Sequence, residues 1–437
     1  MEALNKKTIL SARDVEIQFS LRGDKLTAIR GCSLDLYEGE TLAIVGESGS
    51  GKSVFTKSFL GMLDQNGSIT GGSIMYEGND LAKYTTEKEW RTIRGKKISM
   101  VMQDPMTSLN PLKKVGMQIQ ESIELHQGLD KAAAKAEAIR MLDIVGIPNP
   151  EVRYNQYPHE FSGGMRQRAV IAIAVACHPD ILICDEPTTA LDVTIQAQIL
   201  DLIRKLQKNL GMTIIYITHD LGVVANVADR VAVMYAGQIV EIGMAEEIFY
   251  DAWHPYTWAL LSALPQLGIK GEKLPTIDGT PPNLFNKITG DAFAPRNRQA
   301  LAIDFKKEPP FFDVSPTHKA KTWYLDPRAP KVTQPESIKR LAQRMNEDFG
   351  SNLKHPHEGS RYTGQGPSGN VRHGPQKVRC RRQRKLRDLP RRDLLAGWRI
   401  RFRQNHHRPR HNQDKPDHRR RNTLQGPQDK RKNIQGA

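Results

Sequence analysis

Residues 46–53 carry the feature that most narrows what this chain can fold into, a loop with the spacing G-x-x-x-x-G-K-[ST]. Residues 41–45 before it are typical of a buried strand, and residues 52–63 after it are typical of a helix. Between a strand and a helix N-terminus, such a loop turns backbone N–H groups toward a bound phosphate. Lys52 would reach the β- and γ-phosphates, and the Ser53 hydroxyl would ligate Mg²⁺. The pattern predicts a nucleoside triphosphate site formed by Gly46, Glu47, Ser48, Gly49, Ser50, Gly51, Lys52 and Ser53.

Two adjacent carboxylates, Asp185 and Glu186, end the apolar segment at residues 181–184. Charged groups at the end of a buried strand are costly unless they face a cleft and meet a partner or a metal ion. Beside the phosphate loop, Asp185 fits the Mg²⁺ shell, and Glu186 fits a base that orients the attacking water. Phosphoryl transfer depends mainly on positioning and charge neutralisation, so this small set of residues is nearly sufficient for it.

A Ser-Gly-Gly sequence at residues 162–164 precedes a helical run that continues to Ala176. It is a plausible N-cap, and its hydroxyl and free N–H groups are also a good anion site. Short β-type segments and turns fill residues 8–95, and strands alternate with helices farther along, for example at 213–217. This alternation around a phosphate loop predicts an α/β fold with a mainly parallel sheet and helices on both faces.

Six motifs in order resemble the nucleotide-binding subunit of an ABC transporter. After the phosphate loop come elements similar to the Q-loop, signature, Walker B motif, D-loop and switch histidine of that family, at Gln103, residues 161–165, Asp185-Glu186, Asp192 and His219. The resemblance implies an ABC ATPase core of the P-loop NTPase class that binds ATP and Mg²⁺. It also implies a second cassette, because this chain carries one cassette and the complete site takes its signature from a partner.

The resemblance assigns roles to single residues. Gln103 would approach Mg²⁺ and the γ-phosphate, and His219 would contact the γ-phosphate during hydrolysis. Phe19 resembles the aromatic residue that stacks on adenine, and the alternative for this residue is a place in the core. The residues expected to serve the composite site with a second cassette are Ser162, Gly163, Gly164 and Asp192.

Composition and motifs divide the chain into three parts. Residues 1–250 hold the six motifs and form the predicted ATPase domain, with a helical subdomain at about 104–165. The later sequences HPYT, LLSALP and GTPP are similar to the appended segment of oligopeptide/dipeptide importer ATPases, closest to the first ATPase of oligopeptide importers. They predict an extension at residues 251–350. Periodicity then disappears, and residues 351–437 are predicted to form a disordered basic tail.

The predicted extension departs from its family at one place. Many members carry a cysteine cluster that reads Gly-Cys-x-Phe-x-x-Arg-Cys, whereas residues 290–297 of this chain read GDAFAPRN. Thiolates are the ligands of iron–sulfur clusters, so we predict no iron–sulfur cluster here. The chain has 4 cysteines and no C-x-x-C pair, which favours reduced thiols in a cytosolic protein.

The tail holds the basic excess of the chain. After residue 352 there are 24 Lys and Arg against 6 Asp and Glu, whereas the preceding residues carry 40 against 42. Such a tail can be a solvated segment or a nucleic-acid-binding arm. A third interpretation comes from residues 396–407, which read AGWRIRFRQNHH. Permitted codons for them, read one base later, encode LVGESGSGKTT, a second phosphate loop with its preceding strand. The tail is therefore predicted to be an out-of-frame reading of an adjacent gene for a partner ATPase.

These features favour an ATP-hydrolysing subunit of a bacterial oligopeptide importer. The expected partners are a second, homologous ABC ATPase in a heterodimer, two membrane permease subunits and an extracellular peptide-binding protein, with no nucleic acid. Because the N-terminus lacks a signal-peptide core and the most apolar run is too short to span a bilayer, the expected location is peripheral, at the cytoplasmic face of the cell membrane. The alternatives are an ATPase of a nickel or other small-solute importer, and a non-transport ABC protein that binds nucleic acid through its tail.

Overall fold

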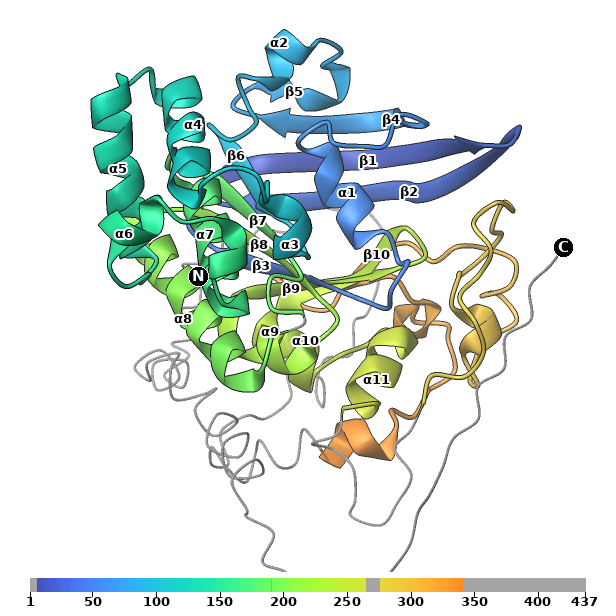
Figure 1. Cartoon of the computed structure of the whole chain (residues 1–437). Coiled ribbons are helices and arrows are strands. Elements are labelled where there is room, and N and C mark those ends of the chain that lie inside the picture. Colours follow the sequence, from blue (N-terminus) through green and yellow to red (C-terminus); the bar gives the residue numbers. More distant parts are fainter. Residues whose placement is uncertain (1–5, 190, 265–275, 341–437) are drawn as a thin grey trace, which may run out of the picture. The chain divides into compact units, whose positions relative to one another are not determined.

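Two β-sheets organise the part of the chain that the structure describes (Figure 1). The computed structural model describes residues 6–189, 191–264 and 276–340. The predicted tail, residues 351–437, lies outside these residues. The first sheet is antiparallel with the order β2-β1-β4-β5. Its strands are β1 (Thr8–Leu21), β2 (Asp24–Tyr37), β4 (Gly67–Tyr76) and β5 (Asn79–Asp80).

The two long strands β1 and β2 differ from the short segments predicted from the sequence. Each has 14 residues, and they form one hairpin through the turn at Arg22 and Gly23. In β1 the register shifts between Ala12 and Val15, and Asp14 adopts a positive φ of 48°. Such a bulge breaks the alternation of inward and outward side chains, so one continuous strand looks like two short ones in the sequence.

The second sheet carries the mainly parallel core that the sequence predicts. Its order is β11-β12-β10-β9-β3-β8-β7-β6, and β9, β3, β8, β7 and β6 pair in parallel. The strands are β3 (Thr41–Val45), β6 (Ile98–Val101), β7 (Ile181–Asp185), β8 (Thr213–Thr218), β9 (Arg230–Tyr235), β10 (Gln238–Met244), β11 (Phe312–Asp313) and β12 (Lys319–Ala320). β12, from the predicted extension, pairs antiparallel with β10, so the extension continues the sheet of the ATPase domain.

Alternate residues of the parallel strands serve two different cores. In β7, Leu182 and Cys184 pack in a cluster with helices, whereas Ile181 and Ile183 pack in a cluster with β1, β2 and α1. Successive side chains of a strand point to opposite faces, which explains the division. Helices therefore cover one face of the parallel strands, but the other face is covered by the antiparallel sheet together with α1. Helices thus lie on both faces as predicted, but the prediction missed the antiparallel sheet that shares the second face with α1.

Helices follow the strands and fill the region between β6 and β7. The α-helices are α1 (Lys52–Ser58), α2 (Glu87–Trp90), α3 (Pro105–Ser108), α4 (Val115–Gln127), α5 (Lys131–Ile144), α6 (Pro150–Tyr154), α7 (Gly163–Val175), α8 (Val193–Leu210), α9 (Leu221–Val227), α10 (Ala245–Tyr250) and α11 (Pro255–Ser262). Short 3₁₀ turns lie at Leu81–Lys83, Pro158–Glu160, Ala294–Arg296 and Trp323–Leu325. Helices α3 to α6 occupy the part of the chain predicted as a helical subdomain.

The helix after the phosphate loop is shorter than predicted. α1 ends at Ser58, and the Lys57 carbonyl accepts N–H groups from Leu60 and Met62 in the turn that follows. Gly61 has a positive φ of 58°, and a Cβ there would lie 2.2 Å from the Trp90 ring. A glycine in the left-handed region is a common helix stop, and it overrides the apolar pattern that extends to residue 63.

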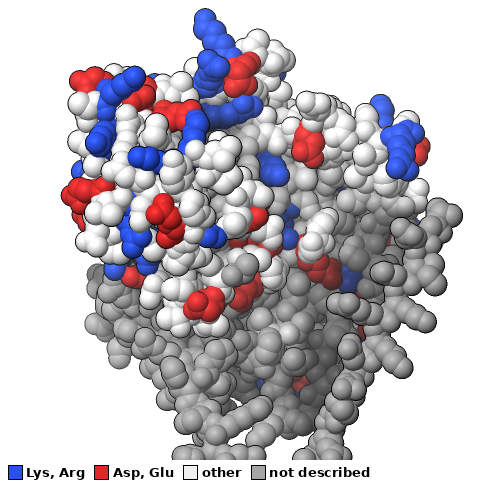
Figure 2. All heavy atoms as spheres, viewed as in Figure 1, with Lys and Arg blue, Asp and Glu red and all other residues white. Residues whose placement is uncertain are grey.

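Within the described residues no helix is long and apolar enough to cross a bilayer. On the face seen in Figure 2, Lys and Arg are interspersed with Asp and Glu over α2, α4 and α5. Neither sign of charge covers a continuous area of that face. This mixture agrees with the near balance of charges counted before residue 353.

Candidate nucleotide-binding site

Three neighbouring parallel strands deliver the predicted catalytic residues to one edge of the sheet. β3 pairs with β8, and β8 pairs with β7. The phosphate loop follows β3, the Asp185-Glu186 pair ends β7, and His219 follows β8. The carboxyl ends of parallel strands lie at the same edge, where α/β folds bind their ligands.

The phosphate loop depends on the absence of a side chain at Gly46. Its φ is +153°, and a Cβ there would lie 2.2 Å from the Met234 carbonyl oxygen. Lys52 curls back over the loop and donates hydrogen bonds of 2.9 Å to the carbonyls of Gly46 and Glu47. Its ammonium is buried, and this burial lowers the pKa of Lys52 from its ordinary value. The loop thus presents a cation at the N-terminus of α1, where phosphate groups bind.

Ser53 and Asp185 lie together, as expected for two ligands of one cation. The Ser53 hydroxyl donates a hydrogen bond of 2.9 Å to Asp185 Oδ1. Burial raises the pKa of Asp185, and the bond from Ser53 opposes that effect. A hydroxyl and a carboxylate are both oxygen donors of the kind Mg²⁺ takes beside phosphate oxygens. These residues fit a magnesium ion.

Glu186 is held by three side chains. His219 Nδ1 lies 3.0 Å from Oε1, and Gln103 Nε2 and Thr189 Oγ1 each donate to Oε2 at 3.0 Å. Burial raises the pKa of Glu186, but the bonds from His219 and Thr189 outweigh it and hold the pKa below its ordinary value. The structure therefore brings Gln103 and His219 together on the carboxylate that the sequence proposes as the base.

A cavity of about 1000 Å³ joins these groups. Its polar end is lined by the phosphate loop, Gln103, Asp185, Glu186 and His219. The apolar lining from β1 and β2 comes from Phe19, Leu21, Leu26 and Ala28. Phe19 itself is buried, and its role in stacking on adenine stays a prediction.

Two lining residues, Pro281 and Leu284, come from the predicted extension. The Leu284 carbonyl accepts a hydrogen bond from the Thr27 N–H in β2 at 3.2 Å, which fixes this segment against the cavity. The sequence interpretation treated the GTPP run as a mark of the subfamily and missed its place in the site. No local pattern signals this contact, because it joins segments more than 250 residues apart in the chain.

The predicted residues of the composite site do not line this cavity. Ser162 caps α7, accepting the Met165 N–H at 3.3 Å, and Gly163 and Gly164 begin that helix. Asp192 caps α8, accepting the N–H groups of two residues in its first turn. These contacts give each residue a local structural role. Their action on ATP bound to a second cassette stays a prediction.

The two positions where the family pattern has cysteine carry hydrogen-bonding side chains. Asp291 Oδ1 accepts the Phe293 N–H at 2.9 Å, and Asn297 Nδ2 donates to the Tyr324 hydroxyl at 2.7 Å. Burial raises the pKa of Asp291 to about 6. Among the described residues no group of three or more His, Cys, Asp or Glu is arranged to hold a metal ion. The expected lack of an iron–sulfur cluster stays a prediction.

Two family models match the chain in the order of its segments. The model described as "ABC transporter" matches residues 29–189, and the one described as "Oligopeptide/dipeptide transporter, C-terminal region" matches residues 240–303. The first covers the phosphate loop, Gln103, the signature and the Asp185-Glu186 pair. With the parallel sheet and the site described above, these matches define an ABC-type ATPase.

The similarity to known relatives covers almost the whole length of each relative. The oligopeptide transport ATP-binding protein AmiE of Streptococcus pneumoniae is 58% identical over 345 residues, 79% of this chain and 97% of that protein. OppD of Bacillus subtilis, another oligopeptide transport ATP-binding protein, is 56% identical over 343 residues, 78% of this chain and 96% of its own. The dipeptide transport ATP-binding protein DppD of Lactococcus lactis is 54% identical over 343 residues, with 78% and 98% covered. The chain belongs to this family of oligopeptide/dipeptide transporter ATP-binding proteins.

Proposed function

We propose that this chain hydrolyses ATP to energise an ABC importer that takes up oligopeptides across the bacterial cytoplasmic membrane. The observation that carries the proposal is the position of Glu186. Its carboxylate, held by Gln103 and His219, lines the same cavity as Lys52 and the Ser53–Asp185 pair. The relatives named for oligopeptide transport supply the substrate class.

The phosphate end of the cavity would bind and orient the triphosphate. The N–H groups of the loop and the Lys52 ammonium would hold the β- and γ-phosphates. Ser53 and Asp185 would hold Mg²⁺, with Gln103 near it. When bound, Mg²⁺ neutralises charge that develops on the phosphate oxygens. On nucleotide binding, Lys52 would exchange its bonds to the loop carbonyls for bonds to phosphate oxygens.

Glu186 would act as the general base. A lowered pKa keeps its carboxylate ionised at neutral pH, ready to orient and polarise the attacking water. The His219 side chain is 61% exposed and faces the carboxylate, so its ring can also meet the γ-phosphate. The apolar end of the cavity, with Phe19, would take the adenine base.

A second cassette would complete the site. Ser162 and Gly163 are exposed at the start of α7 and are free to close over ATP bound to a partner. We propose a heterodimer with a homologous ABC ATPase, bound to two permease subunits at the cytoplasmic face of the cell membrane. An extracellular peptide-binding protein would deliver the peptide. We propose no nucleic-acid partner.

The test uses bacterial cells whose own copy of this gene is deleted, complemented with the wild-type chain or with Glu186→Gln. The wild-type chain should restore uptake of a labelled oligopeptide. Glu186→Gln should bind ATP but lose about 10²- to 10⁴-fold in hydrolysis, and uptake should stay absent, because the base is lost while the phosphate contacts remain.

The matched control for this test is Glu87→Gln, which removes an exposed carboxylate of α2 that does not line the cavity. It should restore uptake as the wild type does. Near-normal turnover by Glu186→Gln would remove this residue as the base. Restored nickel uptake without peptide uptake would instead favour the small-solute importer.

A further inference from the structure

The extension contacts the phosphate loop at one residue, Glu47. Arg296, at the end of the Ala294–Arg296 turn, donates to both carboxylate oxygens of Glu47, from Nη1 at 2.6 Å and from Nη2 at 3.0 Å. The Glu47 N–H donates to the Tyr256 hydroxyl of α11 at 2.7 Å. Two residues of the extension thus bind the side chain and the backbone of the same loop residue.

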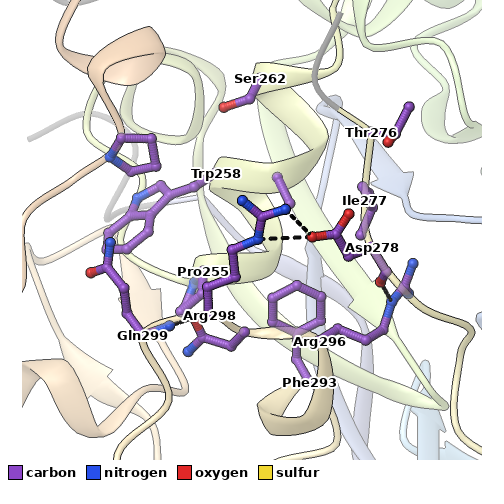
Figure 3. A pocket seen from close by; sticks show the side chains of 13 residues that line it. Pro255, Trp258, Ser262, Thr276, Ile277, Asp278, Phe293, Arg296, Arg298 and Gln299 are labelled. Atoms are coloured by element: carbon purple, nitrogen blue, oxygen red, sulfur yellow. Dashed lines mark hydrogen bonds and ion pairs between the residues drawn. The ribbon is translucent and has the colours of Figure 1, made fainter.

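The Arg296 side chain is buried and is held by further hydrogen bonds besides those to Glu47. It is only 4% exposed. Its Nε donates to the Asp278 carbonyl at 2.7 Å, and Nη1 also lies 3.2 Å from the Tyr235 hydroxyl. Figure 3 shows Asp278 between this arginine and Arg298. A two-pronged pair of this kind fixes direction as well as distance, which a single charge cannot do.

Tyr256 is equally constrained. It is fully buried, with its ring centroid 4.5 Å from that of Tyr235 and 5.3 Å from that of Phe293. Phe293 lies three residues before Arg296 in the segment that replaces the cysteine motif. The hydroxyl therefore has little freedom to move away from the Glu47 N–H.

The carbonyl of Glu47 connects these contacts to Lys52, the residue proposed to hold phosphate. This carbonyl accepts the Lys52 ammonium at 2.9 Å and the Ser50 N–H at 3.2 Å. All three polar parts of Glu47 are therefore engaged: the carboxylate and the N–H with the extension, and the carbonyl with the loop itself. Displacement of Glu47 would displace both the lysine and the turn that presents the N–H groups.

We propose that Arg296 and Tyr256 are positioning residues of the ATP site, through which the extension holds the phosphate loop in its nucleotide-binding shape. This inference rests on the proposed ATPase activity. Neither residue lines the cavity, so they would act on affinity by setting the loop before ATP arrives. The carbonyls and N–H groups of the loop then need no rearrangement when the triphosphate binds.

The experiment measures binding of a fluorescent ATP analogue and steady-state hydrolysis for the full chain, four single variants and one double variant. Arg296→Gln and Tyr256→Phe should each raise the dissociation constant and the KM for ATP by about tenfold, the loss expected for one or two buried hydrogen bonds. The kcat should change by less than about twofold, because bound ATP restores the loop around the catalytic groups. Arg296→Lys should fall between the wild type and Arg296→Gln.

The fourth variant, Arg328→Gln, is the matched control. Arg328 makes a similar two-pronged pair with Asp326 in the extension, but its side chain is 86% exposed. It should leave both constants unchanged. A double variant with Glu47→Gln and Arg296→Gln should be no weaker in ATP binding than Arg296→Gln alone, because the two residues act through one contact.

Three results would overturn the inference. One is a dissociation constant within twofold of wild type for both Arg296→Gln and Tyr256→Phe. The second is an equal loss of affinity in Arg328→Gln, and the third is weaker ATP binding by the double variant than by Arg296→Gln alone. If Arg296→Gln fails to fold, Tyr256→Phe decides alone, since it removes a single oxygen and keeps the ring. A wild-type chain that binds ATP but hydrolyses none would contradict the proposed function, and the binding constants would still test the inference.

Discussion

At the residue scale, backbone and side-chain contacts together fix the carboxylate proposed as the catalytic base. Glu186 adopts a positive φ of 45°, a conformation that costs a non-glycine residue free energy. Its N–H donates to the Ile217 carbonyl in β8 at 3.0 Å, which fixes the turn after β7. Together with the side-chain bonds from Gln103, Thr189 and His219, this contact sets the direction of the carboxylate. The strained backbone is therefore maintained by the groups that make the site.

Leu284 offers a test of the base end of the cavity. We expect Leu284→Ala to raise the KM for ATP by about fivefold, because the substitution removes apolar surface that the base would cover. The kcat should stay close to that of the wild type, since the phosphate end is untouched. Steady-state hydrolysis at varied ATP concentration measures both constants.

Phe285→Ala serves as the control for that substitution. Phe285 is the next residue in the chain, is 46% exposed and does not line the cavity. An equal rise in KM for both variants would mean that the segment matters as a whole and that Leu284 has no special contact with the base.

The residues of the phosphate end could be predicted from the sequence because each one lies at or directly after the end of a short, recognisable strand. The loop, the Asp185-Glu186 pair and His219 each follow a buried strand, and parallel strands end at one edge. Arg296 and Tyr256 could not be found in this way. Their contacts with Glu47 span 249 and 209 residues of sequence, and no periodic pattern links them.

At the element scale, a buried ion pair joins the start of β12 to its neighbouring strand β10. Just before β12, His318 Nε2 lies 2.9 Å from Glu241 Oε1, and both side chains are fully buried. The same carboxylate accepts the N–H groups of Trp253 at 2.6 Å and His254 at 3.1 Å. A glutamate in the core sheet thus joins the two segments of the extension that precede α11 and β12.

This arrangement predicts a stability that depends on pH. Burial alone would lower the pKa of His318, but the bond to Glu241 and the nearby carboxylates of Glu247 and Asp251 outweigh it and raise the pKa. The folded protein therefore binds this proton more tightly than the unfolded chain does. The contribution is fully present below about pH 6.5 and is lost as the pH rises through the folded-state pKa.

We expect His318→Gln to lower the free energy of unfolding by roughly 1–2 kcal/mol at pH 6, a shift of about 2–6 °C in the unfolding midpoint. The loss should be smaller at pH 9, where a smaller fraction of the wild-type histidine carries the proton. Thermal unfolding of both proteins at the two pH values measures this difference. His159→Gln, an exposed histidine, should cost nothing at either pH. A loss for His318→Gln that is equal at pH 6 and pH 9 would contradict the expected charge.

The elements themselves were predicted with uneven success, and the reasons are physical. Strands β3, β7 and β8 are buried throughout and mostly apolar because both of their faces are covered, which makes them conspicuous in the sequence. The hairpin of β1 and β2 was missed as one unit because its bulge interrupts the alternation. The end of α1 was placed too late because the apolar pattern continues beyond the glycine that stops the helix.

At the scale of the whole molecule, the described residues join two family segments into one site. The sheet runs from β6 in the ATPase domain to β11 and β12 in the extension, and the cavity is lined from both. The proposed boundary at residue 250 therefore separates two family segments, but the sheet and the cavity use residues from both sides of it.

We expect a chain truncated after Gly350 to keep its ATPase activity and its assembly with the membrane partners, because the described site needs no residue beyond that point. Hydrolysis assays and co-purification with the permeases measure the two properties. Loss of either would give the tail a role.

The origin of the tail has its own test, which is the nucleotide sequence. If the tail is an out-of-frame reading, a shift of one base should open a cassette frame that begins near residue 396 with LVGESGSGKTT. No such frame downstream would refute the hypothesis, and the basic residues would then need an explanation of their own.

The bond between Arg296 and Glu47 also has a consequence for synthesis of the chain. The ribosome makes Glu47 249 residues before it makes Arg296. At bacterial rates of about 5–20 residues per second, the phosphate loop waits roughly 12–50 s for the side chain that anchors it. A nascent cassette would thus have its phosphate-binding sequence but bind ATP weakly until the ribosome has passed Arg296. The late arginine would delay nucleotide capture until the extension is in place.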